Sequence, residues 1–213
     1  MIQCISSDLL ERWLRAWSLS RKLPLPIKFK SGYKVDVGDD KQKARYVFTE
    51  PNEDYLQLTK TIMETWVFLK VCACAEDLMD VIPDHWVVQP QGYMMSCSSP
   101  MTIPKISLPD SYKADVEKYN ATTVVRVLTK DGELASVGRL VIVDDLAVYD
   151  RISTEENHKR KGLATYLMAE LEKVALSHNI NTNFLVATEQ GRKLYQALGW
   201  KVCSPYTTIV IPG

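Results

Sequence analysis

The sequence lacks a net charge, because its 213 residues contain 26 basic and 26 acidic side chains. The balance also holds along the chain, since residues 1–105 and residues 106–213 each carry 13 side chains of either sign. Proteins that bind nucleic acid or anionic membrane surfaces usually present a strong positive field. We therefore expect neither a nucleic-acid partner nor a membrane partner.

Long hydrophobic runs and an export signal are missing as well. No stretch approaches the roughly 20 consecutive apolar residues of a transmembrane helix. The opening Met-Ile-Gln-Cys has no positive leader followed by an apolar core, so we expect no signal peptide. These absences predict a cytoplasmic protein.

Cysteine is scarce and irregularly spaced. The five cysteines are Cys4, Cys72, Cys74, Cys97 and Cys203. One residue separates Cys72 from Cys74 where metal motifs have two, and no second pair or nearby histidine completes a ligand set. We expect reduced, mostly buried thiols and no metal site.

The chain has an ordinary globular composition with one candidate linker. Hydrophobic residues make up 46% of the sequence, enough for a real core. Residues 96–109 are rich in Ser and Pro, which favours a connection between domains. We expect an N-terminal α/β region at residues 1–99 and a second domain at residues 100–213.

Hydrophobic periodicity predicts alternating helices and strands in both regions. In the first region, helices are expected after Asp8 and Pro51 and at 75–82, with strands at 27–37, 44–49 and 67–71 and an extended segment at 86–95. In the second, we expect helices at 112–119, 163–177 and 190–198, strands at 122–128, 134–143, 146–154 and 184–187, and paired strands at 200–204 and 207–211.

The two regions end in similar sequences. Phe68-Leu69-Lys70-Val71 precedes Trp86 by a short helical stretch, and Phe184-Leu185-Val186-Ala187 precedes Trp200 in the same way. This order of features favours an internal duplication in which only the second copy kept a phosphate loop. Chance similarity between two α/β segments is the alternative.

A basic loop joins the expected strand 146–154 to the long helix. It reads His158-Lys159-Arg160-Lys161-Gly162-Leu163-Ala164-Thr165. The first N–H groups of a helix lack partners and carry partial positive charge, so they can bind a phosphate. Gly162 has no Cβ, which lets the backbone approach closely. The loop therefore suits a diphosphate ligand, although a basic triplet alone is often a solvated surface patch.

This context resembles the GNAT acetyltransferase superfamily. The family signature is Gln or Arg, two residues, Gly, one residue, then Gly or Ala, and residues 159–164 match it with Lys in the first position. Residues 150–154 resemble the family's splayed fourth strand, and residues 194–200 resemble its final helix and turn. The resemblance implies an α/β fold with a mixed, mostly antiparallel, splayed sheet flanked by helices, preceded here by a smaller GNAT-like α/β region.

The resemblance also implies acetyl-CoA as the co-substrate, with its pantetheine arm along the splayed strand and its pyrophosphate on the loop. The implied binding residues are Ile152, Ser153, Thr154, Lys159, Arg160, Lys161, Gly162, Leu163, Ala164, Thr165 and Thr188. Thr188 stands where the family often has asparagine, and its hydroxyl can still hydrogen-bond to the pantetheine.

Acetylation of an amine needs a group that accepts the amine proton and one that protonates the departing thiolate. Tyr195 stands where many members of the family place the acid. Asp150 is the candidate base, because strand alternation puts it on the same face as Ile152 and Thr154. Glu155 and Glu156 are rival bases at the exposed strand end.

The resemblance predicts an N-acetyltransferase that acts on the primary amine of a small molecule or an amino-acid-like acceptor. Two alternatives stay open: a protein N-acetyltransferase, and a non-catalytic module that binds acyl-CoA. The oligomeric state, including a homodimer, is open too.

Overall fold

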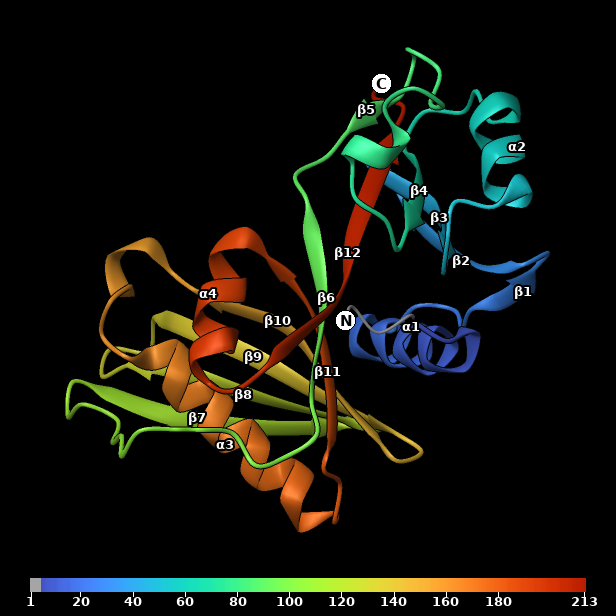
Figure 1. Cartoon of the computed structure of the whole chain (residues 1–213). Helices are drawn as coiled ribbons and strands as arrows, with labels where there is room; N and C mark the ends of the chain where they lie inside the picture. Colours follow the sequence, from blue (N-terminus) through green and yellow to red (C-terminus); the bar gives the residue numbers. More distant parts are fainter. Residues whose placement is uncertain (1–4) are drawn as a thin grey trace. The chain divides into compact units, whose positions relative to one another are not determined.

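The computed structural model describes residues 5–213, which form two compact units (Figure 1). The first unit contains the chain up to Met95 together with Val186–Lys193 and Val202–Gly213. The second contains Ser96–Leu185 and Leu194–Lys201. These compact units are interleaved along the chain. The division into domains at residues 1–99 and 100–213 stays a prediction. The chain returns to the first unit because its last strand, β12 (Lys201–Val210), pairs with β4 (Val67–Val71).

The first unit is a mostly antiparallel sheet with two helices. Its elements are α1 (Ser7–Arg21), β1 (Ile27–Phe29), β2 (Gly32–Asp39), β3 (Gln42–Phe48), α2 (Glu53–Thr61), β4, a 3-10 turn η1 (Glu76–Leu78) and β5 (Val87–Val88). The strand order is β1-β2-β3-β4-β12, with β5 also on β12. Only β3 and β4 are parallel, and α2 connects them.

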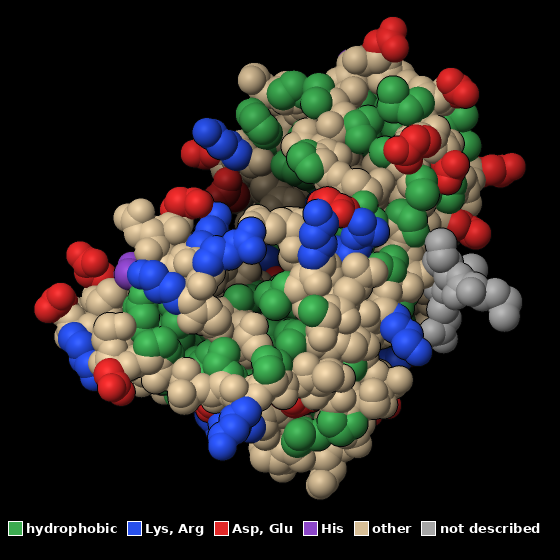
Figure 2. Space-filling view, turned by 60° about the vertical axis from the view of Figure 1, so that its left-hand side comes forward, with side chains coloured by type: hydrophobic (Ala, Val, Ile, Leu, Met, Phe, Trp, Pro, Cys, Tyr) green, Lys and Arg blue, Asp and Glu red, His purple; other side chains and the backbone are tan. Residues whose placement is uncertain are grey.

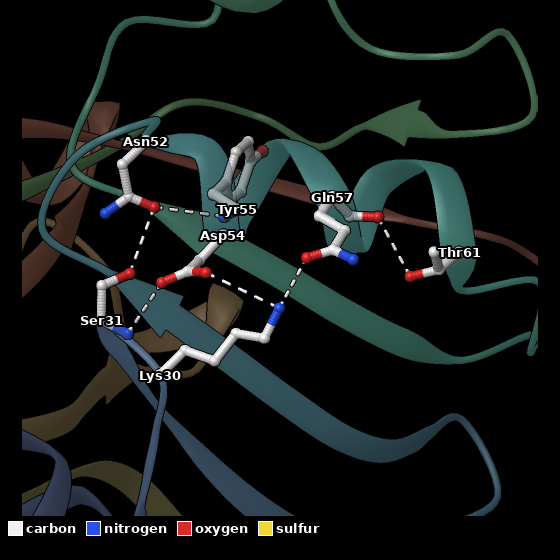
Figure 3. Close-up of polar contacts among 7 residues, drawn as sticks. All are labelled: Lys30, Ser31, Asn52, Asp54, Tyr55, Gln57 and Thr61. Atoms are coloured by element: carbon white, nitrogen blue, oxygen red, sulfur yellow. Dashed lines mark hydrogen bonds and ion pairs between the residues drawn. The ribbon is translucent and has the colours of Figure 1, made fainter.

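Side-chain caps fix where α2 begins (Figure 3). The Asn52 side chain accepts the Tyr55 N–H at 3.2 Å and the Ser31 hydroxyl at 3.2 Å. The Ser31 N–H donates to Asp54 at 3.1 Å, and the Lys30 ammonium lies 3.6 Å from the same carboxylate. The helix start is thereby tied to the turn between β1 and β2.

A continuous apolar cluster lies between α2 and this sheet. Its buried members are Phe48, Tyr55, Leu58, Leu69, Val71, Leu78, Trp86 and Ile209. The rings of Phe48 and Tyr55 meet edge to face at 5.7 Å between centroids. The Trp86 indole N–H donates to the Thr59 carbonyl at 2.8 Å, which satisfies a polar group that would otherwise be buried alone.

The second unit contains a mixed sheet. Its elements are β7 (Tyr112–Tyr119), β8 (Thr122–Thr129), β9 (Leu134–Val143), β10 (Leu146–Thr154), a 3-10 turn η2 (Glu156–His158), α3 (Leu163–Ser177) and β11 (Thr182–Thr188). The order is β11-β10-β9-β8-β7, and only β10 and β11 are parallel. Helix α3 lies across one face of this sheet (Figure 1).

Four of the described elements contain residues of both units: β6 (Gly92–Cys97), β11, α4 (Glu189–Ala197) and β12. The expected fold class is confirmed, because both units are mostly antiparallel sheets flanked by helices. Each unit also contains one parallel strand pair connected by a helix, β3-α2-β4 and β10-α3-β11. The internal duplication itself stays a prediction. Across residues 5–213, no helix is long and apolar enough to span a bilayer.

The helix expected at 112–119 is wrong, because this segment is strand β7. It pairs with β8 over its whole length, from Tyr112 opposite Thr129 to Tyr119 opposite Thr122. The polar, edge-strand sequence hides the strand pattern, and pairing with β8 overrides local helix propensity. Asn120, with φ of 47°, begins a two-residue turn and is the signal that predicts a hairpin.

The remaining differences concern strand and helix boundaries. The two strands expected at 200–204 and 207–211 are the single strand β12. The strand expected at 27–37 is divided into β1 and β2 by Lys30, whose φ is 51°. The helix expected at 75–82 is only the 3-10 turn η1. The cysteines Cys72, Cys74, Cys97 and Cys203 are free thiols, and Cys4 lies outside the described residues.

Candidate active site

Strand β10 separates from β11 halfway along its length. The two strands pair from Leu146 opposite Thr182 to Tyr149 opposite Leu185, and their pairing stops there. On its other side, β10 stays paired with β9 as far as Thr154. Within the described chain, the β11-facing edge of β10 is therefore unpaired with β11 beyond Asp150, which is the splay that the family resemblance implied.

A β-bulge lies at the point of separation. Asp150 faces Arg139 and Ser153 faces Val137, so three steps along β10 match two along β9. Arg151 takes the left-handed conformation, with φ of 51°. A bulge of this kind bends the strand and increases its twist, which carries β10 away from β11.

The bulge also changes which side chains share a face. Ile152 lies over Gly138, on the side of the sheet that α3 covers, because a Cβ on Gly138 would meet both Ile152 and Leu171 of α3. Thr154 lies on that side too, with its hydroxyl 2.8 Å from that of Ser136, two residues before Gly138.

Asp150 lies on the opposite face from Ile152 and Thr154. It stands across from Arg139, which alternates with Gly138 along β9. Ser153 shares the Asp150 face, and its carbonyl accepts the Ser136 hydroxyl at 2.6 Å. The expectation that Asp150 shares a face with Ile152 and Thr154 is therefore wrong, because regular alternation does not continue through a bulge.

Helix α3 begins without a side-chain cap. Gly162 is the N-cap residue, with φ of 77°, and its carbonyl accepts the first helical hydrogen bond from Tyr166 at 3.0 Å. Among the described contacts, the N–H groups of Leu163, Ala164 and Thr165 donate to no protein atom. Three main-chain donors at the positive end of a 15-residue helix are thus available to an anion.

Gly162 is required here for two reasons. Its φ lies in the left-handed region, where a Cβ is strained. A Cβ at this position would also meet the Ile106 side chain at 3.1 Å. Ile106 belongs to the segment 96–109 that we interpreted as a linker, so part of that segment packs against the loop.

The three basic residues of the loop differ in what they contact. Lys159 pairs with Glu156 in the turn η2. Lys161 donates to the Tyr112 hydroxyl at 3.2 Å. Arg160 is exposed and makes no ion pair within the described residues. Arg160 can therefore reach a ligand without losing a partner. The face shown in Figure 2 carries Lys and Arg side chains interspersed with acidic and apolar ones.

Tyr112 forms hydrogen bonds with two residues of the basic loop, and the sequence did not predict this role. Its hydroxyl lies 2.9 Å from Nδ1 of His158, and the two rings meet edge to face with centroids 5.7 Å apart. Together with its contact to Lys161, this side chain connects β7 to the last residue of the basic triplet and to His158, which directly precedes the triplet. The signal was missed because we placed Tyr112 on a helix.

Tyr195 lies on α4 with its ring against Trp200, at 6.1 Å between ring centroids. The side chain is buried. Burial raises the pKa of its phenol well above the ordinary value, and the negative charge of Asp150 raises it further. The phenol therefore stays protonated at neutral pH and has a proton to donate.

The three candidate bases are in different surroundings. Asp150 is half-buried, and its negative charge raises the pKa of the Tyr195 phenol. Glu155 and Glu156 are exposed, and Glu156 is paired with Lys159. Of the three carboxylates, only Asp150 has a charge that affects the pKa of the candidate acid Tyr195.

Thr188 is not grouped with the other predicted site residues. It ends β11 in the segment Val186–Lys193, which belongs to the first unit. Its side chain is exposed, and its hydroxyl accepts the Gly191 N–H at 3.1 Å. In this structure Thr188 caps the first turn of α4.

These features fit acetyl-CoA in two respects. The free amides at the start of α3, beside a glycine without a Cβ, suit a diphosphate. The open edge of β10 presents unpaired main-chain groups to the amides of a pantetheine arm, as a sheet edge does to an added strand.

Comparison with known proteins identifies a family to which part of the sequence matches. Residues 94–200, half of the chain, match the acetyltransferase (GNAT) family. A GCN5-related N-acetyltransferase from Kribbella flavida is similar in structure, with a TM-score of 0.65 and 14% identity over 98% of this chain and 96% of that one.

Two further structures give the same result. A GCN5-related N-acetyltransferase from Sphaerobacter thermophilus has a TM-score of 0.58 and 11% identity over 99% of this chain and 95% of that one. A GCN5-related N-acetyltransferase-like protein from Streptococcus suis has a TM-score of 0.59 and 16% identity over 84% and 83%. These likenesses show the fold alone, and no protein of curated function matches the sequence. The match over residues 94–200 shows that the chain belongs to the acetyltransferase (GNAT) family.

Proposed function

We propose that this protein transfers the acetyl group of acetyl-CoA to the primary amine of a small molecule or an amino-acid-like acceptor. The observation that carries the proposal is the uncapped start of α3, with three free amides, in the same unit as the open edge of β10. Family membership supports acyl transfer as the class of reaction.

In this proposal the protein holds the co-substrate mainly through its backbone. The N–H groups of Leu163, Ala164 and Thr165 bind the diphosphate, and Arg160 adds a positive charge. Main-chain groups of Ile152, Ser153 and Thr154 pair with the pantetheine amides. When bound, acetyl-CoA supplies an acetyl group that is activated as a thioester.

Two side chains handle the protons. The half-buried Asp150 carboxylate attracts the acceptor's ammonium group and takes one proton, which leaves a neutral amine with a free lone pair. Tyr195 keeps its phenol proton at neutral pH and donates it to the departing thiolate. One group thus accepts a proton from the attacking amine and the other donates a proton to the leaving thiolate.

The test is a turnover assay with a panel of primary amines, amino acids and lysine peptides. CoA release should be followed by chromatography, because free cysteines of the protein would react with thiol reagents. At a ligand concentration of 100 times Kd, acetyl-CoA should stabilise the fold by about 2.7 kcal/mol.

The outcomes separate the alternatives. Acetylation of small amines but not of peptides supports the proposal, whereas acetylation of peptides alone would show a protein N-acetyltransferase. Stabilisation by acetyl-CoA without turnover of any amine would show a non-catalytic acyl-CoA-binding module. The free thiols of Cys72, Cys74, Cys97 and Cys203 support a cytoplasmic location.

A further inference from the structure

Lys70 is a partly buried cation without an acidic partner. It lies on β4 in the first unit, and its ammonium donates to the Thr208 hydroxyl at 2.8 Å. Within residues 5–213, no ion pair includes Lys70. An ammonium has three N–H donors, so two of them remain for another acceptor.

The surroundings of Lys70 are positively charged. Burial lowers the pKa of its ammonium well below the ordinary value, and the charges of Arg45 on β3 and Arg21 on α1 lower it further. Both guanidinium groups lie over the ring of Trp17, Arg45 at 3.4 Å and Arg21 at 4.3 Å from its centroid. The Lys70 amine and two guanidinium cations therefore share one small region of the first unit.

A second donor without an acceptor lies beside Lys70. Tyr206 on β12 is only 4% exposed, and its hydroxyl has no hydrogen-bond partner among the described residues. The Tyr206 ring centroid is 5.6 Å from the Lys70 ammonium. Buried hydroxyl groups are normally hydrogen-bonded, so an unpartnered one beside an unpaired cation needs an explanation.

We propose that Lys70, Thr208 and Tyr206 form a binding site for a small oxyanion, a carboxylate or a phosphate group, within the field of Arg45 and Arg21. The protein presents donors at this place, so a ligand that consists of acceptors satisfies them together. A negative charge also offsets the cost of holding Lys70 as an ammonium in partly buried surroundings.

This site is distinct from the acetyl-CoA site of the proposed function. All of its residues belong to the first unit, whereas the start of α3 and the splayed part of β10 belong to the second. If no anion binds at Lys70, the proposed acetyl transfer is unaffected. If the protein does not transfer an acetyl group, the proposed anion site can still exist.

The experiment is thermal unfolding and calorimetric titration of the full-length protein at pH 7 with sodium phosphate and, separately, with sodium malonate. Sodium chloride at matched ionic strength is the reference, which removes general screening. We expect a saturable rise in Tm with at least one of the two anions. The two titrations distinguish a phosphate from a carboxylate ligand.

The variant Lys70→Met keeps the length of the side chain but removes its charge. We expect the anion to bind at least about tenfold more weakly to it, since hydrogen bonds to charged groups are the strong ones. Lys43→Met is the matched control, because Lys43 is an exposed lysine on β3 whose ammonium pairs with Glu64 at 2.9 Å. It should bind the anion like the unmodified protein.

Tyr206→Phe is the second variant and should weaken anion binding severalfold through loss of one donor. It also carries the test if Lys70→Met does not fold. The proposal is overturned if neither anion raises Tm beyond the chloride reference. It is equally overturned if either variant, once folded, binds the anion as tightly as the unmodified protein.

Discussion

The phenol of Tyr195 on α4 lies within the electrostatic field of the Asp150 carboxylate on β10. Burial raises the pKa of the phenol, and the Asp150 charge raises it further. A protonated phenol and a carboxylate are the two proton carriers that acetylation of an ammonium requires. Asp150 lies on the face opposite α3 because it pairs with Arg139, and the bulge at Arg151 changes the faces only of the residues that follow it.

Removing the Tyr195 hydroxyl should reduce turnover and leave binding intact. We expect Tyr195→Phe to lower kcat by about 100-fold or more, because a positioned general acid contributes roughly that much. The Kd for acetyl-CoA should stay unchanged. Steady-state kinetics and calorimetry measure the two quantities, and Tyr46→Phe on β3 is the control for loss of a phenol hydroxyl. Turnover at the unmodified rate would show that Tyr195 only packs.

Asp150→Asn tests the base. If Asp150 accepts the amine proton, kcat measured by steady-state kinetics should fall by about 100-fold. The pKa of Tyr195 should also fall towards its ordinary value, because a raising negative charge is gone. Glu155→Gln and Glu156→Gln are matched controls that should change kcat less than about threefold. A larger effect from either control would reassign the base.

Gly162→Ala should weaken acetyl-CoA binding and destabilise the fold. The left-handed φ costs an L-residue about 1–2 kcal/mol, and the new Cβ would also crowd Ile106. Gly38→Ala separates the two effects, because Gly38 has a φ of 72° and no atom within 4 Å of its added Cβ. Urea unfolding should show a loss in both variants, and calorimetry a weaker Kd only in Gly162→Ala. Equal Kd values would contradict the proposed role of the loop.

Glu172 gives a prediction about stability and pH. This α3 carboxyl is buried, and burial raises its pKa, while the Met101 N–H opposes that rise. A raised pKa means that the folded state prefers the neutral acid, so stability is lost as pH rises through the folded-state pKa.

Glu172→Gln should therefore unfold at higher urea concentration than the unmodified protein at pH 7. The difference should shrink as pH falls below the ordinary pKa of glutamate, where both side chains are neutral. The amide oxygen can still accept the Met101 N–H. A constant difference across this range would show that the Glu172 charge does not matter to stability.

Local sequence was enough to find the parts of the site that depend on local structure. Gly162 before an apolar helix predicted the loop and helix start, and the β-branched strand before it predicted β10. Both follow from short-range rules about helix starts and strands.

What sequence did not show depends on contacts between distant segments. The bulge at Arg151 is a shift in the pairing register between β9 and β10. Regular alternation misses this shift, so it predicted that Asp150 shares a face with Ile152 and Thr154. The role of Tyr112 under the loop depends on pairing with β8, which local propensity did not reveal. The return of β12 to the first unit is likewise set by its pairing with β4.

The most direct measurement concerns the amides at the start of α3. In two-dimensional NMR of nitrogen-15-labelled protein, the backbone amides of Leu163, Ala164 and Thr165 should shift on titration with CoA. The same amides should shift with inorganic pyrophosphate, because the account assigns them to the diphosphate. If CoA binds while these three amide signals stay in place, the start of α3 does not hold the diphosphate, and the proposed active site is contradicted.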